Sequence, residues 1–273
     1  MQNESPISLR ILLFCLVASV VILSYLTYDY IRHQHSFVVF CNVSKGYAVY
    51  IRSKKGLDVV VNTGPDKKII ECLSRYMPFF DRRIEYFILT NSSQSYIGGA
   101  SYLLNRYRIS NFYIADDIFA KNSTLNGVNK EKFNSFNTKR LSMVDSIYIE
   151  DSVFYIKKIS SSVTEKYLLT FDTNQNKIYL MAELSGRTIN NLLRSCYSCH
   201  DTKRVILQLP YLALDEKLLS ILRSLADKGI VVIKATVTSQ PSIRLSDMKE
   251  RLNSIKFEYL ISNQGKDIVI SLN

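Results

Sequence analysis

Histidine is scarce in this sequence: the 273 residues contain only three, His33, His35 and His200. Zinc catalysis needs three or four protein ligands per ion together with an activated water. His33 and His35 lie in a short polar linker, so only His200 remains for the rest of the chain. The count alone therefore excludes a hydrolase with a His-rich two-metal site.

Internal repeats and low-complexity tracts are also absent. Charged side chains make up 22% of the chain and hydrophobic ones 47%, a balance typical of a folded globular protein. At this length the chain can bury a sizeable core, in one large domain or two small ones.

One long stretch, Ile11 to Tyr28, carries no charge at all. It is long enough to cross the hydrocarbon core of a bilayer. The stretch ends in bulky and aromatic residues, Ser24 to Tyr28, whereas a signal peptide needs small residues at its cleavage site. We therefore expect an uncleaved single-pass membrane anchor; a cleavable signal peptide and a buried core helix are the alternatives. The flanking basic residues do not choose an orientation.

The hydrophobic pattern divides the chain into an anchor (1–30), a linker (31–36) and one domain (37–273). Alternating apolar residues bounded by turn residues predict strands at 37–41, 47–52, 57–62, 84–89, 111–115, 146–150, 153–159, 166–171, 177–181, 205–209, 230–234, 258–261 and 267–271. Helical spacing predicts helices at 66–77, 96–107, 184–194, 215–226 and 246–252.

The stretch Arg83–Gly99 organises the rest of the chain. A buried strand ends at Thr90, the polar loop Asn91–Ser95 follows, and Tyr96 opens a helical pattern. This order places a site at the carboxyl end of a strand. The loop contains no His, Asp, Glu or Cys. Its amides could bind an anion at the helix N-terminus; the alternative is that Ser95 only caps the helix.

The loop and its frame resemble the signature of the metallo-β-lactamase fold. More narrowly, they resemble the C-terminal metallo-β-lactamase-like domain of ComEC, the DNA-uptake channel protein. The family pattern is Leu-Thr, then His-x-His-x-Asp-His, then Ile-Gly-Gly. Leu89-Thr90 and Ile97-Gly98-Gly99 keep the frame here. Asn91, Ser93, Ser95 and Tyr96 stand where the family has its two histidines, aspartate and last histidine.

The likeness runs from about Ser36 to the C-terminus. In the opening motifs, the family's acids become Asn42, Tyr47 and Asn62. Glu183 stands where the family has its bridging aspartate, and Tyr211 stands where it has a metal-binding histidine.

The closing segment 262–270 resembles the family's final hairpin. The resemblance implies a four-layer αββα sandwich that has lost its metal ligands. It also suggests that the domain lies outside the cytoplasm.

Cys196-Tyr197-Ser198-Cys199-His200 is the sharpest isolated motif, because C-x-x-C-H is the attachment sequence of c-type haem. Three interpretations stay open: a local disulfide or ordinary thiol pair, a structural metal or redox pair, and a haem site. The other cysteines, Cys15, Cys41 and Cys72, form no obvious disulfide framework.

Positive charge is concentrated in the domain. The chain has 35 basic and 24 acidic residues, and the first 36 residues hold two of each, so the domain carries the whole net charge of +11. Such a charge attracts polyanions, either nucleic acid or anionic lipid. The alternative is that it serves solubility close to a membrane.

Together these features predict a metal-free, non-catalytic module without a cofactor, tethered to the cell membrane with its domain outside the cytoplasm. It would bind DNA or a partner membrane protein of an uptake or secretion system. The expected binding residues are Asn91, Ser93, Ser95, Tyr96, Glu183 and Tyr211. The alternatives are a redox or c-type haem carrier through Cys196, Cys199 and His200, and a residual hydrolase. The hydrolase is the weakest of these, because no nucleophile–base pair is recognisable.

Overall fold

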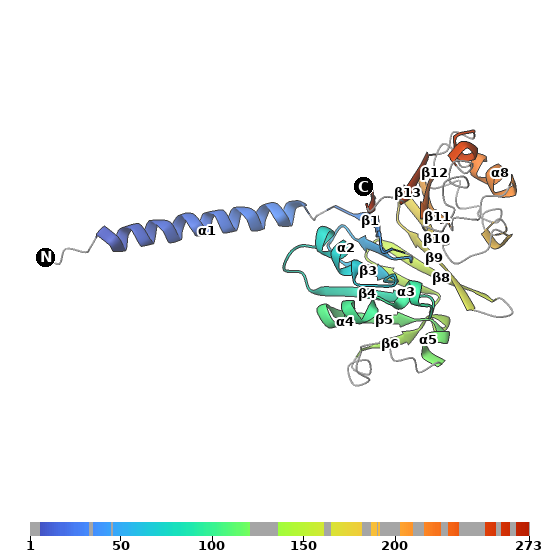
Figure 1. Ribbon diagram of the computed structural model, residues 1–273, viewed down its shortest axis with the longest axis horizontal. Helices are drawn as coiled ribbons and strands as arrows, with labels where there is room; N and C mark the ends of the chain where they lie inside the picture. The colour runs from blue at the N-terminus through green and yellow to red at the C-terminus, as the bar shows by residue number, and fades with distance from the viewer. Residues whose placement is uncertain are drawn as a thin grey trace.

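Two seven-stranded sheets form the centre of the molecule. The structure, a computed structural model, describes residues 6–32, 35–44, 46–120, 136–160, 165–181, 187–189, 191, 203–209, 216–224, 229–234, 249–254, 258–262 and 266–272. Figure 1 shows the sheets facing each other, with a long N-terminal helix projecting from one side of the domain.

The first sheet, sheet A, combines antiparallel and parallel strands. Its order is β14 (Ile268–Ser271), β1 (Phe37–Phe40), β2 (Val49–Arg52), β3 (Asp58–Val61), β4 (Arg83–Leu89), β5 (Arg108–Ile114) and β6 (Thr138–Arg140). Neighbours from β14 to β3 are antiparallel, and those from β3 to β6 are parallel.

The second sheet, sheet B, also combines parallel and antiparallel strands. Its order is β13 (Glu258–Ser262), β12 (Gly229–Lys234), β11 (Arg204–Leu209), β10 (Asn176–Leu180), β9 (Glu165–Asp172), β8 (Ser152–Ser160) and β7 (Ser146–Ile149). Neighbours from β13 to β10 are parallel, and those from β10 to β7 are antiparallel.

Helices cover the outer faces of both sheets (Figure 1). They are α2 (Lys68–Tyr76), α3 (Gln94–Ile97), α4 (Ala100–Arg106) and α5 (Asp116–Ala120) beside sheet A, the 3₁₀ turn η1 (Leu141–Met143), and α8 (Glu216–Ser224) beside sheet B. Strands β2 and β3 are buried along their whole length, as expected for strands covered on both faces. The expected αββα sandwich is confirmed.

Aromatic side chains fill much of the core. The rings of Phe87 and Phe112 stack with their centroids 4.8 Å apart, and those of Phe154 and Phe171 lie at the same separation. All four side chains are buried. The core therefore depends on ring pairs between neighbouring strands.

Two local expectations are wrong. The segment 262–270 does not close a hairpin, because β13 is the edge of sheet B while β14 pairs with β1 in sheet A. The helix expected at 96–107 begins earlier, at Gln94, and is divided into α3 and α4. Ser95 therefore lies within α3 and does not cap it; Ser93 occupies the N-cap position.

The N-terminal helix α1 (Pro6–Arg32) does not pack into the core of the domain. Its segment Leu9–Tyr28 is long and apolar enough to cross a membrane, and none of it is buried against the domain. The buried-helix alternative is therefore wrong. A membrane span and a signal sequence both meet the length and composition of this segment.

A disulfide that the sequence analysis did not anticipate joins Cys41, just after β1, to Cys72 in α2. Their Cα atoms are 5.8 Å apart, within the range that a disulfide bridges. Both residues are fully buried. The bond closes a loop with a sequence separation of 31 residues.

The strand register gives the sandwich two distinct ends. The start of β1 at Phe37 pairs with Arg52, and Arg52 pairs with Asp58 at the start of β3. Strands β4 and β5 begin side by side at Arg83 and Arg108. We call this end, where α1 joins the domain, the α1 end. The far end is where β3, β4 and β5 finish.

Removing this disulfide is expected to destabilise the domain. Closing a loop of this length lowers the entropy of the unfolded chain, so the Cys41→Ala/Cys72→Ala variant should lose about 3–4 kcal/mol of unfolding free energy. Urea unfolding of the full chain in detergent, with and without reductant, measures the loss. Cys15→Ala is the matched control, because Cys15 is exposed on α1 and unpaired. A wild-type transition insensitive to reductant would contradict the prediction.

Candidate functional site

At the far end, the ends of β3 and β4 are joined through Asn62 and Thr90. The Thr90 amide donates to Asn62 Oδ1 at 3.0 Å, and Asn62 Nδ2 donates to Thr90 Oγ1 at 3.0 Å. Asn62 has a positive φ of 59°, a conformation that asparagine tolerates better than most residues. Both residues are buried. The polar groups next to the expected site thus bind each other.

The loop 91–96 is held by its own polar groups. Asn91 Oδ1 accepts the Ser93 amide at 2.7 Å, a short local turn that precedes α3. The Ser92 amide donates to Asp117 Oδ2 at 3.1 Å, and the Ser95 carbonyl accepts the Tyr47 amide at 3.1 Å. The loop is therefore fixed against α5 and the segment before β2.

Tyr96, at the end of the loop, packs against Tyr47. Their rings stack with centroids 5.3 Å apart, and the Tyr96 carbonyl accepts the Thr63 amide at 2.7 Å. The family pattern has a histidine at position 96 and an acid at position 47. Here an aromatic contact occupies both positions.

Two glycines retained in the frame have a packing role of their own. A Cβ on Gly98 would overlap the Pro65 carbonyl oxygen, and one on Gly99 would overlap the carbonyl oxygens of Asp66 and Thr63. The two backbones approach too closely for any side chain. These glycines are therefore needed whether or not a metal is bound nearby.

A small cavity lies between described residues of the two sheets at this end. The cavity measures about 20 Å³, enough for roughly one water. The described residues that line it include no acid, histidine or cysteine: Tyr47, Val49, Val61, Asn62, Thr90, Tyr167, Leu169, Leu180 and Gln208. Over the described parts of the chain, no three His, Cys, Asp or Glu side chains gather closely enough to hold a metal ion. These residues do not fit zinc, which needs several N, S or carboxylate ligands.

Four of the expected site residues thus lie together in one loop: Asn91, Ser93, Ser95 and Tyr96. Glu183 and Tyr211 lie outside the described residues, and so does the motif Cys196–His200. The second half of the expected site and the haem or redox alternative therefore remain predictions.

Solved structures with the same architecture are proteins of the metallo-β-lactamase type. A diphosphatase from the PhnP family aligns with a TM-score of 0.52 and 14% identity, over 85% of this chain and 97% of that chain. The long form of RNase Z from yeast aligns with a TM-score of 0.51 and 9% identity, over 84% of this chain and 44% of that chain. The metallo-β-lactamase MIM-2 gives a TM-score of 0.38 and 13% identity, over 80% and 81% of the two chains.

This chain therefore has the metallo-β-lactamase fold. Identities this low establish the fold alone. No protein-family model matches the sequence, and no curated protein matches it either. None of the comparisons bears on the narrower resemblance to ComEC.

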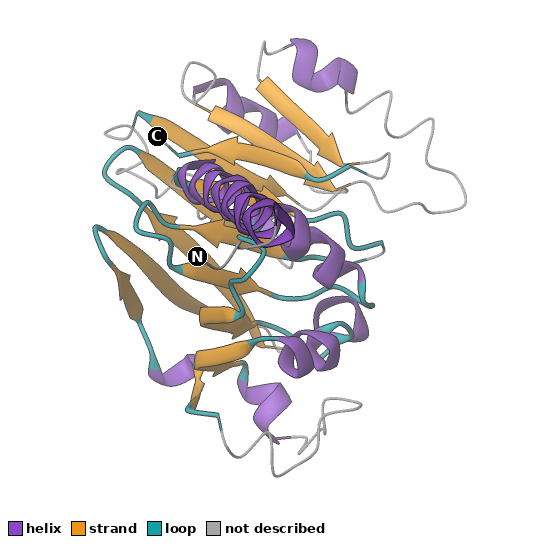
Figure 2. Ribbon diagram, turned by 90° about the vertical axis from the view of Figure 1, so that its left-hand side faces the viewer, coloured by secondary structure: helices purple, strands orange, loops and turns teal. Residues whose placement is uncertain are grey.

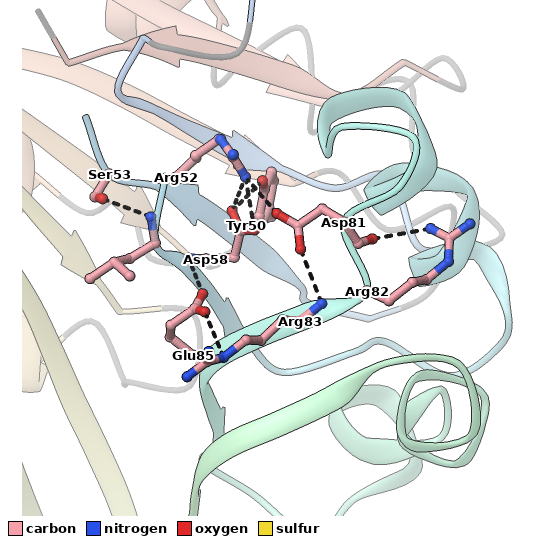
Figure 3. Close-up of polar contacts among 9 residues, drawn as sticks. Tyr50, Arg52, Ser53, Asp58, Asp81, Arg82, Arg83 and Glu85 are labelled. Atoms are coloured by element: carbon pink, nitrogen blue, oxygen red, sulfur yellow. Dashed lines mark hydrogen bonds and ion pairs between the residues drawn. The ribbon is translucent and has the colours of Figure 1, made fainter. Parts of the chain in front are cut away.

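A second polar cluster lies at the α1 end, and the sequence analysis missed it (Figure 3). Arg52 Nη1 lies 2.6 Å from Asp58 Oδ1 and 3.7 Å from Asp81 Oδ2. The Tyr50 hydroxyl donates to Asp58 Oδ1 at 2.7 Å, and Glu85 Oε2 accepts the Asp58 amide at 2.8 Å. Arg52 and Asp58 face each other across the β2–β3 hairpin. An opposite-charge pair beside a predicted turn was the signal that could have revealed the cluster.

Burial dominates the electrostatics of this cluster. It raises the pKa of Asp58 to about 7, although the neighbouring Arg52 guanidinium acts in the opposite direction. It also raises the pKa of the Tyr50 hydroxyl well above its usual value. A carboxylate this deeply buried depends on its partner for its charge.

A cavity of about 530 Å³ opens beside this cluster, between turns of the two sheets. Its size is that of a small-molecule pocket. Its lining has both signs of charge, with Lys54 from the β2–β3 turn and Glu150 and Asp151 from the β7–β8 turn.

Removing the arginine tests the cluster. Arg52→Met removes the partner of a buried carboxyl group, so we expect the loss of unfolding free energy to grow towards about 3–5 kcal/mol as the pH rises above the folded-state pKa of Asp58. The folded-state pKa of Asp58 already exceeds its unfolded value and should rise further in the variant. Asp58 therefore favours folding at low pH, and this contribution is lost as the pH rises through the folded pKa.

Urea unfolding at several pH values measures this effect. The deficit of Arg52→Met should shrink towards about pH 5, where Asp58 binds a proton. The Arg52→Met/Asp58→Asn variant is the control, because it has no buried charge and its stability should vary less with pH. An equal deficit at all pH values would rule out this account of the cluster.

Proposed function

We propose that this chain is a non-catalytic metallo-β-lactamase-fold module, held at a membrane by α1, that binds DNA. The observation that supports the proposal is that, over the described residues, no cluster of metal-binding side chains is found, and that a cavity of about 20 Å³ lies beside the hydrogen-bonded pair Asn62–Thr90. A partner protein of an uptake or secretion system is the alternative ligand.

Two features support a tethered domain outside the cytoplasm. The segment Leu9–Tyr28 of α1 is not buried against the domain and is long and apolar enough to cross a membrane. The Cys41–Cys72 disulfide is of a kind that persists in oxidising compartments and is rare in the cytosol. The resemblance to the ComEC domain points in the same direction.

The outer face of the β7–β8 hairpin supports DNA as the ligand. Tyr148 and Tyr155 are 73% and 49% exposed, and the exposed Lys157 follows on the same face of β8. Ile147 and Phe154 point to the core, so the alternation of the strands turns the two tyrosines outward together. Exposed aromatic rings beside basic side chains suit the stacking of unpaired bases. The net charge of +11 would attract the phosphate backbone.

The non-catalytic assignment predicts a metal-poor protein. The full chain, purified in detergent and dialysed against micromolar zinc and manganese, should retain well under one ion of either metal per chain. The physical reason is that Asn62 and Thr90 are already bonded and that the described residues lining the cavity include no carboxylate or imidazole. Elemental analysis measures the content, and a stoichiometric amount of either metal would end the proposal.

The DNA assignment predicts salt-dependent binding. Single-stranded DNA should bind at low salt, and the logarithm of the affinity should fall linearly with the logarithm of the salt concentration. Tyr148→Ala and Tyr155→Ala should each weaken binding by roughly 1–3 kcal/mol. Fluorescence anisotropy measures both effects.

Tyr102→Ala is the matched control, because Tyr102 is 50% exposed on α4, away from the β7–β8 face. Absence of binding at low salt, or an equal loss in the control, would argue against this surface.

A further inference from the structure

A short connection keeps the α1 end of the domain close to the last turn of helix α1. Arg32 is the last residue of α1 and Phe37 the first of β1. Five residue steps span at most about 18 Å. Figures 1 and 2 show α1 projecting from this side of the domain. A bilayer crossed by α1 would therefore lie opposite the α1 end.

On the sheet A side, this end presents basic side chains outward and acidic ones inward. The exposed basic residues are Lys54, Lys55, Arg82, Arg83, Arg106 and Arg108. Asp58 is fully buried and Asp81 and Glu85 are half-buried, and all three are bonded within the polar cluster of Figure 3. Because these acidic side chains are buried and bonded, the surface potential at this end is more positive than a count of its basic and acidic residues would indicate.

Two large apolar side chains lie beside these basic residues. Phe79 and Phe80, in the connection between α2 and β4, are 70% and 55% exposed. Their rings are 6.1 Å apart, and the Arg82 guanidinium lies 6.0 Å from the centre of the Phe79 ring. Figure 1 shows this connection reaching out on the side of α1. Neither ring belongs to the hydrophobic core, and most of the apolar surface of the pair faces solvent.

We propose that the α1 end rests on the anionic lipid surface of the same bilayer that α1 crosses. Phe79 and Phe80 insert at the level of the headgroups, and the basic side chains around them face lipid phosphates. Aromatic rings flanked by Lys and Arg suit this interface, and their attraction to it grows with the content of anionic lipid. The inference rests on the proposed membrane tether. It extends that proposal by orienting the domain, with the far end directed away from the lipid.

Because the chain contains no tryptophan, a single introduced tryptophan can report on this contact by its fluorescence. Phe79→Trp places one indole at the proposed contact. Met143→Trp is the matched control, since Met143 is 76% exposed in η1, which follows the end of β6 at the far end. Each full-length variant is reconstituted into phosphatidylcholine vesicles with and without phosphatidylglycerol, and its emission is measured with ordinary and brominated lipids.

The expected result is a difference between the two reporters. In anionic vesicles, the emission of the Phe79→Trp variant shifts to shorter wavelength and is quenched by brominated lipid, and that of Met143→Trp is not. Both effects weaken without phosphatidylglycerol, and also when Lys54→Glu and Lys55→Glu are added.

Two outcomes overturn the proposal: equal emission from both reporters, or a blue shift without quenching, which would place the ring against protein. An alkaline wash separates this failure from that of the tether. Release of the chain by the wash refutes the membrane span itself, whereas a retained chain with a solvent-exposed indole refutes only the lipid contact.

Discussion

The close approach of two turns at the far end governs this structure. The turn after β3 and the loop after β4 exchange backbone hydrogen bonds, from Thr63 to the Tyr96 carbonyl and from Gly99 to the Gly64 carbonyl. At Gly98 and Gly99 the two backbone segments lie so close together that a side chain on either glycine would overlap the turn after β3. This contact sets the ends of β3 and β4 and the start of α4. The two glycines of Ile97-Gly98-Gly99 are therefore required by backbone packing, whatever side chains stand in the loop before them.

Much of the architecture could be predicted from local pattern. Strands such as β1, β8 and β11 were predicted to within a residue or two, because alternation and turn residues are local signals. The separation of β13 from β14 was not, since both have strand-like sequences and only long-range packing decides which sheet each joins. The start of α3 was misplaced because Gln94 and Ser95 are polar and the apolar helical pattern begins only at Tyr96.

The site was predictable only in part. The polar loop was identified because its residue types stand in a recognisable frame. The Cys41–Cys72 bond was missed because its partners lie in a strand and a helix whose contact no sequence spacing reveals. The Arg52–Asp58 pair could have been found from hairpin register. Its energetic importance could not, because it comes from burial by elements distant in sequence.

The disulfide also has a mechanical consequence. Any pull transmitted along α1 enters the domain at Phe37, in a strand held on both sides by β14 and β2. The pull acts along the strands, so it loads both rows of hydrogen bonds in shear. Cys41, at the other end of the same short strand, passes the force through a covalent bond to α2. A force on the tether would therefore be shared by two neighbouring strands and a helix before β1 could be pulled out of the sheet.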